Sequence, residues 1–172
     1  MIVIVMGVSG CGKSTVAEAL ARCLEGDFFD ADPYHPPANV EKMSRGIPLT
    51  DEDRAGWLAA LADLLRSRTG FSRPTVLACS ALKESYRRIL RVSPEVRFVY
   101  LKGSFEVIEA RMKARSDHFM KPGMLESQFK TLEEPATGPG TFTIAVDVTL
   151  PIDAIVDQVI SPANGLFPGA PS

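Results

Sequence analysis

The chain has 172 residues, of which 45% are hydrophobic and 23% charged, and its formal net charge is −2. These values are ordinary for a globular protein and exclude a largely disordered chain. The slight acidity argues against a general nucleic-acid or membrane-surface binder, because both functions need a dominant basic field. The length predicts one domain, with room for a local basic pocket that binds a small anion.

Cysteine usage and hydropathy predict where the protein works. Cys11, Cys23 and Cys79 contain no C-x-x-C pair, so neither a disulfide framework nor a zinc site is expected. The apolar run 1–6 is too short to span a bilayer and lacks the basic flank of a signal peptide. We therefore expect a cytoplasmic protein with no membrane partner and no nucleic-acid partner.

The predicted elements alternate between strands and helices. A β-branched run at 2–6 predicts a strand buried on both faces, and the apolar stripe within 13–25 predicts a helix after it. Four more short apolar strands follow, at 28–29, 75–79, 96–101 and 143–148. Two further helices are expected at 39–45 and 82–91. Three more are expected to begin at a cap at Thr50, at a cap at Ser104 and near Pro151. This order predicts an α/β fold in which helices cover both faces of a five-stranded parallel sheet.

Two stretches, 32–54 and 111–134, do not fit simple crossovers between parallel strands. Both are rich in charge, Pro, Gly or Met and follow the carboxyl side of a strand, where open α/β sheets bind ligands. We interpret them as an acceptor-binding segment at about 33–58 and a mobile lid at about 111–134. They lie within a single domain at 1–160, and the Pro/Gly/Ala-rich tail at 161–172 is expected to be flexible.

A phosphate-binding motif follows the first strand. Residues 7–14 read GVSGCGKS and match G-x-x-x-x-G-K-[ST] between a predicted strand and a predicted helix. Glycines let backbone N–H groups surround the phosphates, Lys13 reaches the β- and γ-phosphates, and Ser14 offers its hydroxyl to Mg²⁺. The predicted ATP-binding residues of this loop are Gly7, Ser9, Gly10, Cys11, Gly12, Lys13, Ser14 and Thr15. The alternative, a chance Gly-rich turn, is disfavoured by the flanking elements.

Other sequence features narrow the class of nucleotide-binding protein. A G protein would need an Asn-Lys-x-Asp motif, but neither Asn39 nor Asn164 precedes a lysine. A motor or transport ATPase would usually carry an acid at the end of a neighbouring apolar strand, and 75–80 has none. The nearest strand-end acids are Asp30 and Asp32, an arrangement typical of small-molecule and nucleotide kinases.

Asp30 and Asp32 lie two residues apart at a strand end, so both can face the phosphates. We assign Asp30 with Ser14 to the metal shell of Mg²⁺. Asp32 is the predicted base that accepts the proton of an attacking hydroxyl, or orients that hydroxyl. The alternative is that one or both aspartates merely cap the following turn.

Cationic and polar residues predict an anionic acceptor. A carboxylate favours a guanidinium, whose two donors match it, and Arg54 lies in the first turn of its predicted helix. The candidate pocket residues are His35, Lys42, Arg54, Lys83, Tyr86 and Arg87. For each of them the alternative is a solvated surface side chain.

The predicted lid carries a second cationic pair. Arg111 and Arg115 lie four residues apart, hence on one helix face, where they could neutralise the transferring phosphoryl group. The apolar run 118–120 would cover the closed site and exclude water. The alternatives are a solvated helix face and ordinary packing against the core.

Several longer strings carry a resemblance to a known family. They are Asp30 to Pro36, Gly46 to Arg54, Ala78 to Lys83 with Tyr86 and Arg87, His118 to Met120, Leu125 to Gln128 and Thr131 to Glu133. Together with the phosphate loop they closely resemble the small gluconokinase family, relatives of shikimate kinase. The resemblance runs from about residue 2 to 134 and leaves out the tail.

The resemblance implies a substrate and an architecture. The implied reaction is ATP-dependent phosphorylation of D-gluconate at its 6-hydroxyl, with Mg²⁺, giving 6-phospho-D-gluconate and ADP for the pentose phosphate or Entner-Doudoroff route. The implied structure is a P-loop kinase-like three-layer sandwich with sheet order 2-3-1-4-5 and a lid, as a homodimer.

The resemblance also implies roles by motif position. The sugar acid would be bound by Asp32, His35, Arg54, Lys83 and Arg87. Arg111 and Arg115 of the lid would bind ATP and act in catalysis with Lys13 and Asp32.

Two alternative functions stay open at this point. A shikimate-type site should show Gly-Gly-Gly after the third strand, where residues 79–81 here read Cys-Ser-Ala; another polyol acid is also compatible with the pocket. A regulatory protein that senses ATP or a sugar acid without turnover would need neither Asp32 nor the lid arginines.

Overall fold

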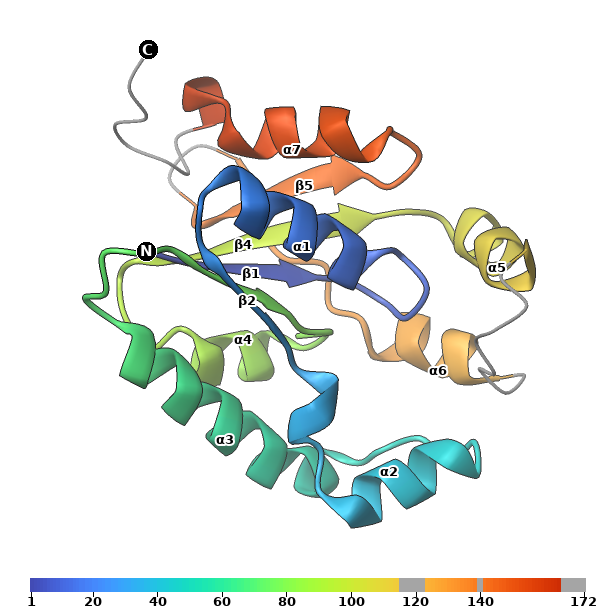
Figure 1. Ribbon diagram of the computed structural model, residues 1–172. Helices are drawn as coiled ribbons and strands as arrows, with labels where there is room; N and C mark the ends of the chain where they lie inside the picture. Colours follow the sequence, from blue (N-terminus) through green and yellow to red (C-terminus); the bar gives the residue numbers. More distant parts are fainter. Residues whose placement is uncertain (115–122, 139–140, 165–172) are drawn as a thin grey trace.

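The computed structural model describes residues 1–114, 123–138 and 141–164 (Figure 1). Arg115, the run 118–120 and the tail beyond 164 lie outside the described residues. The strands are β1 (Ile2–Met6), β2 (Asp27–Asp30), β3 (Thr75–Ala78), β4 (Val96–Lys102) and β5 (Thr143–Asp147). The α-helices are α1 (Lys13–Cys23), α2 (Pro37–Ser44), α3 (Asp51–Arg68), α4 (Glu84–Leu90), α5 (Phe105–Ala114), α6 (Met124–Thr131) and α7 (Ile152–Ile160). Short 3-10 helices lie at Asp32–Tyr34 and Pro162–Asn164.

The five strands form one parallel sheet in the order β2-β3-β1-β4-β5, which confirms the predicted fold class and strand order. The central strand β1 pairs with β3 on one side and β4 on the other, so that Val3 lies opposite Val76 and Arg97. Because all strands run the same way, their carboxyl ends meet at one edge of the sheet. The phosphate loop, Asp30 and the turn at Asp32–Tyr34 all follow strand ends at this edge.

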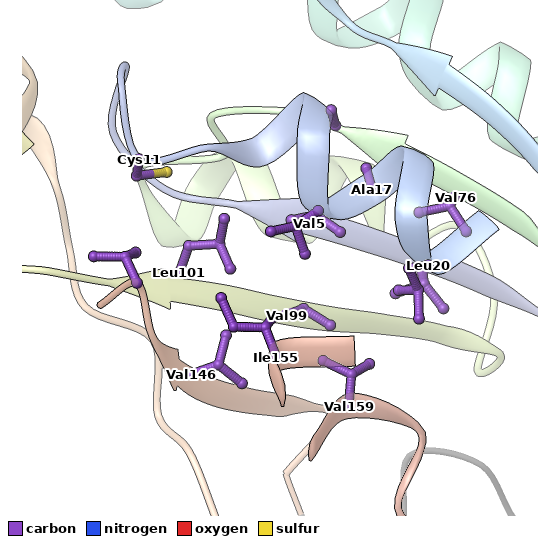
Figure 2. Close-up of a cluster of buried hydrophobic side chains, with 14 of the residues drawn as sticks. Val5, Cys11, Ala17, Leu20, Val76, Val99, Leu101, Val146, Ile155 and Val159 are labelled. Carbon is purple, nitrogen blue, oxygen red and sulfur yellow. The ribbon is translucent and has the colours of Figure 1, made fainter. Parts of the chain in front are cut away.

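The sheet separates two hydrophobic cores. Alternate residues of a strand face opposite sides, and β1 is fully buried, with Val3 and Val5 in one core and Ile2 and Ile4 in the other. The first core lies under α1 and α7, which supply Leu20, Ile155 and Val159 among others (Figure 2). The second core lies under α3 and α4, on the opposite face of the sheet (Figure 1). These are the three predicted layers.

Helix α3 begins where the sequence predicted, at a capping box. Asp53 N donates to Thr50 Oγ1 at 3.2 Å, and Thr50 N donates to Asp53 Oδ2 at 2.9 Å, which satisfies two N–H groups at the helix start. Four residues further on, Trp57 Nε1 donates to Ala31 O at 2.8 Å. This bond fixes the first turns of α3 to the end of β2.

The structure differs from the predicted elements in a few places. Helix α1 ends at Cys23 rather than 25, where Glu25 has φ 51°. Helix α4 begins at Glu84 rather than 82, because the backbone of Lys83 is extended, with φ −98° and ψ 151°, outside the helical region. The expected lid contains helix α6, and the residues after Asp30 form a 3-10 turn where irregular backbone was expected. Among the described helices, none combines the length and apolarity needed to cross a membrane.

Candidate active site

The phosphate loop has the backbone of an anion cradle. Gly7, Gly10 and Gly12 have φ values of 147°, 79° and 98°, a region that side chains with a Cβ rarely adopt. A Cβ at Gly10 would also meet Met112 Cγ at 2.4 Å, so neighbouring α5 requires a glycine there. Gly12 starts α1 without a side-chain cap, which leaves first-turn N–H groups available to a phosphate.

Hydrogen bonds join this loop to the end of β2. Lys13 Nζ donates to Val8 O at 3.0 Å and so folds back over the loop. Ser14 Oγ donates to Asp30 Oδ2 at 2.7 Å, while Asp32 N donates to Asp30 Oδ1 at 3.0 Å. The residues predicted to bind phosphate and metal therefore lie together.

The chemistry of the Ser14–Asp30 pair fits Mg²⁺. A hydroxyl and a carboxylate are hard oxygen donors, which Mg²⁺ prefers, and this ion usually completes its shell with water and substrate phosphates. In the described ranges, no group of three or more His, Cys, Asp or Glu side chains could hold a metal ion.

Cys11 and Cys79 are buried beside this cradle. Burial raises the pKa of the Cys11 thiol above its ordinary value and raises that of Cys79 to about 12. Since the thiolate is the reactive form, both side chains are inert at neutral pH. This favours the interpretation of Cys11 as a small side chain that fits the loop.

On the acceptor side, His35 is held by stacking. Its ring lies parallel to Trp57, with centroids 4.3 Å apart and an interplanar angle of 9°. Asn39 Nδ2 lies 3.3 Å from His35 Nδ1 and donates to Asp53 O at 2.8 Å. Partial burial lowers the pKa of His35 below its ordinary value, so the imidazole is neutral at pH 7.

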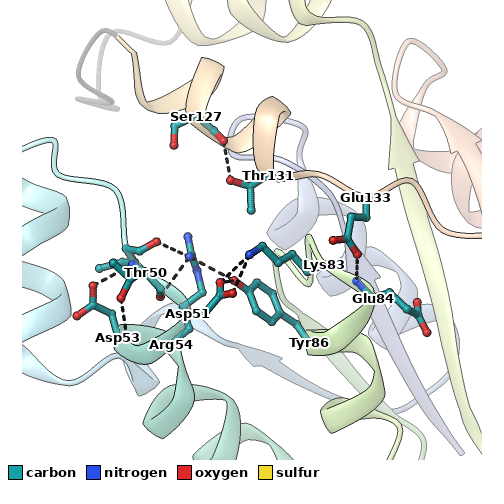
Figure 3. A network of polar contacts seen from close by, with 11 residues as sticks. Thr50, Asp51, Asp53, Arg54, Lys83, Glu84, Tyr86, Ser127, Thr131 and Glu133 are labelled. Atoms are coloured by element: carbon teal, nitrogen blue, oxygen red, sulfur yellow. Dashed lines mark hydrogen bonds and ion pairs between the residues drawn. The ribbon is translucent and has the colours of Figure 1, made fainter.

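A polar network joins the start of α3 to the start of α4 (Figure 3). Lys83 Nζ donates to both carboxylate oxygens of Asp51 at 2.8 Å, and the Tyr86 hydroxyl donates to Asp51 as well. Arg54 Nη1 donates to Leu49 O at 2.5 Å, and its guanidinium lies 5.6 Å from the centroid of the Tyr86 ring. Arg54 and Lys83 therefore both lie against the ring of Tyr86.

The hydrogen bonds fix the charges in this network. The bond to Asp51 raises the pKa of Lys83, and the same bond lowers the pKa of Asp51, so both are charged at neutral pH. Asp51 belongs to one of the motif strings of the family resemblance, but the sequence analysis gave it no role of its own. Its pairing with residues 32 and 35 positions away is a tertiary contact with no local sequence signal.

Comparisons with known proteins find relatives that match this chain along most of its length. The shikimate kinase family profile matches residues 9–137. The thermoresistant gluconokinase of Escherichia coli strain K12 is 46% identical over 160 residues, covering 92% of this chain and 91% of the relative. The gluconokinase of Gluconobacter oxydans strain 621H is 46% identical over 158 residues, covering 91% and 88%. The crystal structure of a gluconokinase from Sinorhizobium meliloti 1021 is 46% identical, has a TM-score of 0.81 and covers 92% of this chain and 88% of that one.

The chain belongs to the gluconokinase family. The match spans nearly the whole chain, from the phosphate loop through both segments that the sequence assigned to the acceptor and the lid. The resemblance drawn from the motif strings is confirmed. The other positions predicted for this gluconokinase-family site can now be placed in the structure.

Arg87 has only 2% of its side chain exposed. Its Nη1 donates to Ala81 O and Leu82 O at 3.0 Å, and its Nε donates to Glu84 Oε2 at 3.0 Å. The structure therefore places these nitrogens under the loop that carries Lys83. Lys42, another candidate, donates to Asp53 at 2.6 Å and joins α2 to the start of α3.

Arg111 lies on α5, and its Nη2 donates to Val148 O at 2.5 Å, beyond the end of β5. Its charge also acts on the Cys11 thiol, which places the guanidinium near the phosphate loop. A residue that the sequence analysis did not assign lies closer: Gln128 of α6 accepts a bond from Ser9 N at 2.6 Å. Residues 125–128 were part of the family resemblance, but no local pattern indicates this contact.

Proposed function

We propose that this gluconokinase-family protein transfers the γ-phosphoryl group of ATP to the 6-hydroxyl of D-gluconate. The observation that carries the proposal is a continuous series of contacts along one sheet edge. Ser14 Oγ donates to one carboxylate oxygen of Asp30, and Asp32 N donates to the other at 3.0 Å. His35 N donates to Asp32 O at 3.1 Å, and the His35 ring stacks on Trp57 of α3. Asp32 therefore connects the phosphate cradle to the acceptor cluster.

Each charge has a role in the proposed reaction. The γ-phosphorus–oxygen bond to ADP breaks, the bond to the 6-oxygen forms, and the hydroxyl proton passes to Asp32. Lys13, with Arg111 and Arg115, neutralises charge on the phosphoryl oxygens. Arg54 and Lys83 hold the gluconate carboxylate at the far end of the acceptor, where the two cations lie against the same tyrosine ring and can offer donors to it.

The proposal includes a metal ion and an assembly. Ser14 and Asp30 would hold Mg²⁺, which supplies neutralisation of the phosphate charge when bound. The expected homodimer, the cytoplasmic location and the supply of 6-phosphogluconate to sugar catabolism stay predictions.

The proposed function is tested by acceptor-dependent ADP release with Mg-ATP. D-gluconate, shikimate, other sugar acids and neutral sugars are compared in parallel. We expect strong turnover with D-gluconate, and we expect Asp32→Asn to lower kcat by about 100-fold or more, since it removes the general base. Asp63→Asn, which changes an exposed carboxylate paired with Arg66 on α3, is the matched control and should leave turnover unchanged.

Each other outcome contradicts part of the proposal. Turnover with a different acid but not with gluconate would refute the substrate and retain the cradle. Release of ADP with no acceptor dependence would refute the kinase function. An Asp32→Asn variant that folds and retains kcat within about tenfold would refute the role of Asp32 as base.

A further inference from the structure

The contact between Gln128 and the phosphate loop carries an inference beyond the assigned residues. Ser9 N donates to Gln128 Oε1 at 2.6 Å, although the two residues lie 119 positions apart. This separation is short for a bond between neutral amide groups, which is usually about 2.9 Å. Ser9 belongs to the loop whose N–H groups surround phosphates, so α6 brings a side-chain amide to the phosphate site itself.

Packing fixes the helix that carries this amide. Leu125 of α6 is buried, and Phe129 of α6 packs edge to face on Phe105 of α5, with ring centroids 5.5 Å apart. Helix α5 in turn contacts the loop, because Met112 lies against Gly10. Since rigid elements hold functional groups more accurately than loops do, the position of Gln128 is set in advance of ligand binding.

The other end of the same helix adjoins the acceptor cluster. Just beyond α6, Glu133 N donates to Leu82 O at 2.9 Å, and Glu84 N donates to Glu133 Oε2 at 2.7 Å. In Figure 3, Ser127 and Thr131 of α6 lie across from Arg54 and Lys83. Helix α6 thus reaches from the phosphate loop, where Gln128 bonds Ser9, to the acceptor cluster, where Glu133 bonds the loop before α4.

The chemistry of the amide then restricts its role. A backbone N–H can only donate, so it is the oxygen of Gln128 that faces Ser9. The Nε2 group, bonded to the same carbon, carries two N–H donors beside the loop. We propose that Gln128 donates from Nε2 to a γ-phosphoryl oxygen of bound ATP while its oxygen stays on Ser9 N–H. This deepens the proposed kinase function and rests on it: Gln128 would orient and stabilise the group as it passes to the acceptor hydroxyl.

Two substitutions separate the donor from the acceptor. Gln128→Glu retains an oxygen for Ser9 N–H but replaces the donor with a charged oxygen that repels phosphate. Gln128→Met removes both functions at similar volume. The matched control is Glu126→Gln, an exposed position of α6 that pairs with Lys130. Thermal melts of each variant check that it is folded.

The measurements are the affinity for a non-hydrolysable ATP analogue, the affinity for ADP and kcat with gluconate. We expect both Gln128 variants to weaken analogue binding about tenfold or more and leave ADP binding nearly unchanged, because only ATP has the γ-phosphate. We expect kcat to fall by about 100-fold, as after loss of one transition-state donor. The control variant should match the wild-type chain in all three.

Other results overturn the inference. If Gln128 only tethers α6 to the loop, Gln128→Met will change the affinities for the analogue and for ADP by the same factor. If Gln128 competes with phosphate for the loop N–H groups, Gln128→Met will bind the analogue more tightly. The binding measurements need no acceptor, so they decide the role of Gln128 even if gluconate proves not to be the substrate; the acceptor comparison decides that question separately.

Discussion

At the scale of single residues, buried polar contacts decide how the acceptor site is built. Arg87 donates to two carbonyls of the loop at residues 81–82, which precedes Lys83 directly. Ala81 in that loop has φ 43°, a strained conformation that persists only where neighbouring contacts hold it in place. The guanidinium therefore supports a strained turn, and through that turn it positions Lys83 against Asp51.

Arg87→Lys tests this positioning role. Lysine cannot reproduce the fork of donors, so at least one buried carbonyl loses its partner, and we expect the free energy of unfolding to fall by about 1–3 kcal/mol. We also expect KM for the acceptor to rise while KM for ATP changes little, because Lys83 would shift. Urea unfolding and steady-state kinetics measure the two effects.

Arg88→Lys is the control for this prediction, because Arg88 lies on the same helix with 75% of its side chain exposed. It should leave both stability and KM unchanged. If Arg87→Lys raised the acceptor KM with no loss of stability, Arg87 would contact the substrate directly, as the sequence analysis predicted.

At the scale of elements, the start of α3 connects the separate parts of the acceptor site. Asp51 pairs with Lys83 of the loop before α4, and Asp53 pairs with Lys42 of α2. The hydrogen bonds to Lys83 and Lys42, respectively, hold the pKa values of Asp51 and Asp53 below their ordinary range. The cap at Thr50 places both carboxylates in the first turn of one helix.

Thr50→Ala should destabilise this helix start. Loss of a threonine N-cap costs about 1 kcal/mol of the free energy of unfolding. Ser67→Ala is the control, because Ser67 lies on the exposed part of the same helix and bonds only the Leu64 carbonyl among the contacts described; a surface change of this kind should stay within about 0.5 kcal/mol. Urea unfolding compares the two, and equal effects would contradict the importance of the cap.

The parts that the sequence predicted are those with local signals. Strand β1, the phosphate loop and the Thr50 cap each depend on residues close together in the chain, and each is found as expected. Helix α6 was not predicted, because Met124–Thr131 lies among charged and Pro/Gly residues that favour a loop interpretation. The expected element ends differ by a residue or two, because Glu25 after α1 has a positive φ and Lys83 before α4 is extended.

The parts of the site that the sequence did not predict are tertiary contacts. Asp51 meets Lys83 across 32 residues, and Gln128 meets Ser9 across 119. Arg87 was assigned to the substrate by its motif position in the family resemblance, whereas the structure buries it. Nothing in its local sequence indicates the two carbonyls that hold it.

At the scale of the whole molecule, the two cores lie on opposite faces of the sheet, and both proposed ligand-binding regions lie at its carboxyl edge. Helix α1, which carries Lys13 and Ser14, packs in the first core, while α3 and α4, which carry Arg54 and Tyr86, pack in the second. A nucleotide bound at the loop therefore contacts elements of the first layer and, through Asp30, the edge strand β2. A ligand that binds the folded state but not the unfolded state raises the stability of the folded protein by mass action.

Mg-ATP should raise the melting temperature accordingly. At a nucleotide concentration 100 times Kd the gain is about 2.7 kcal/mol, which for a chain of this length corresponds to roughly 5–10 °C. Removal of Mg²⁺ with a chelator should reduce the shift, because Asp30 would then face the phosphates without the cation that separates the two negative groups.

Lys13→Met should abolish most of this shift in melting temperature, measured against the ligand-free melting temperature of the same variant. Lys113→Met, an exposed position paired with Glu109 on α5, should retain it. An equal shift in the Lys13 and Lys113 variants would mean that the nucleotide stabilises the chain from some place other than this loop, and the assignment of the cradle would fail with it.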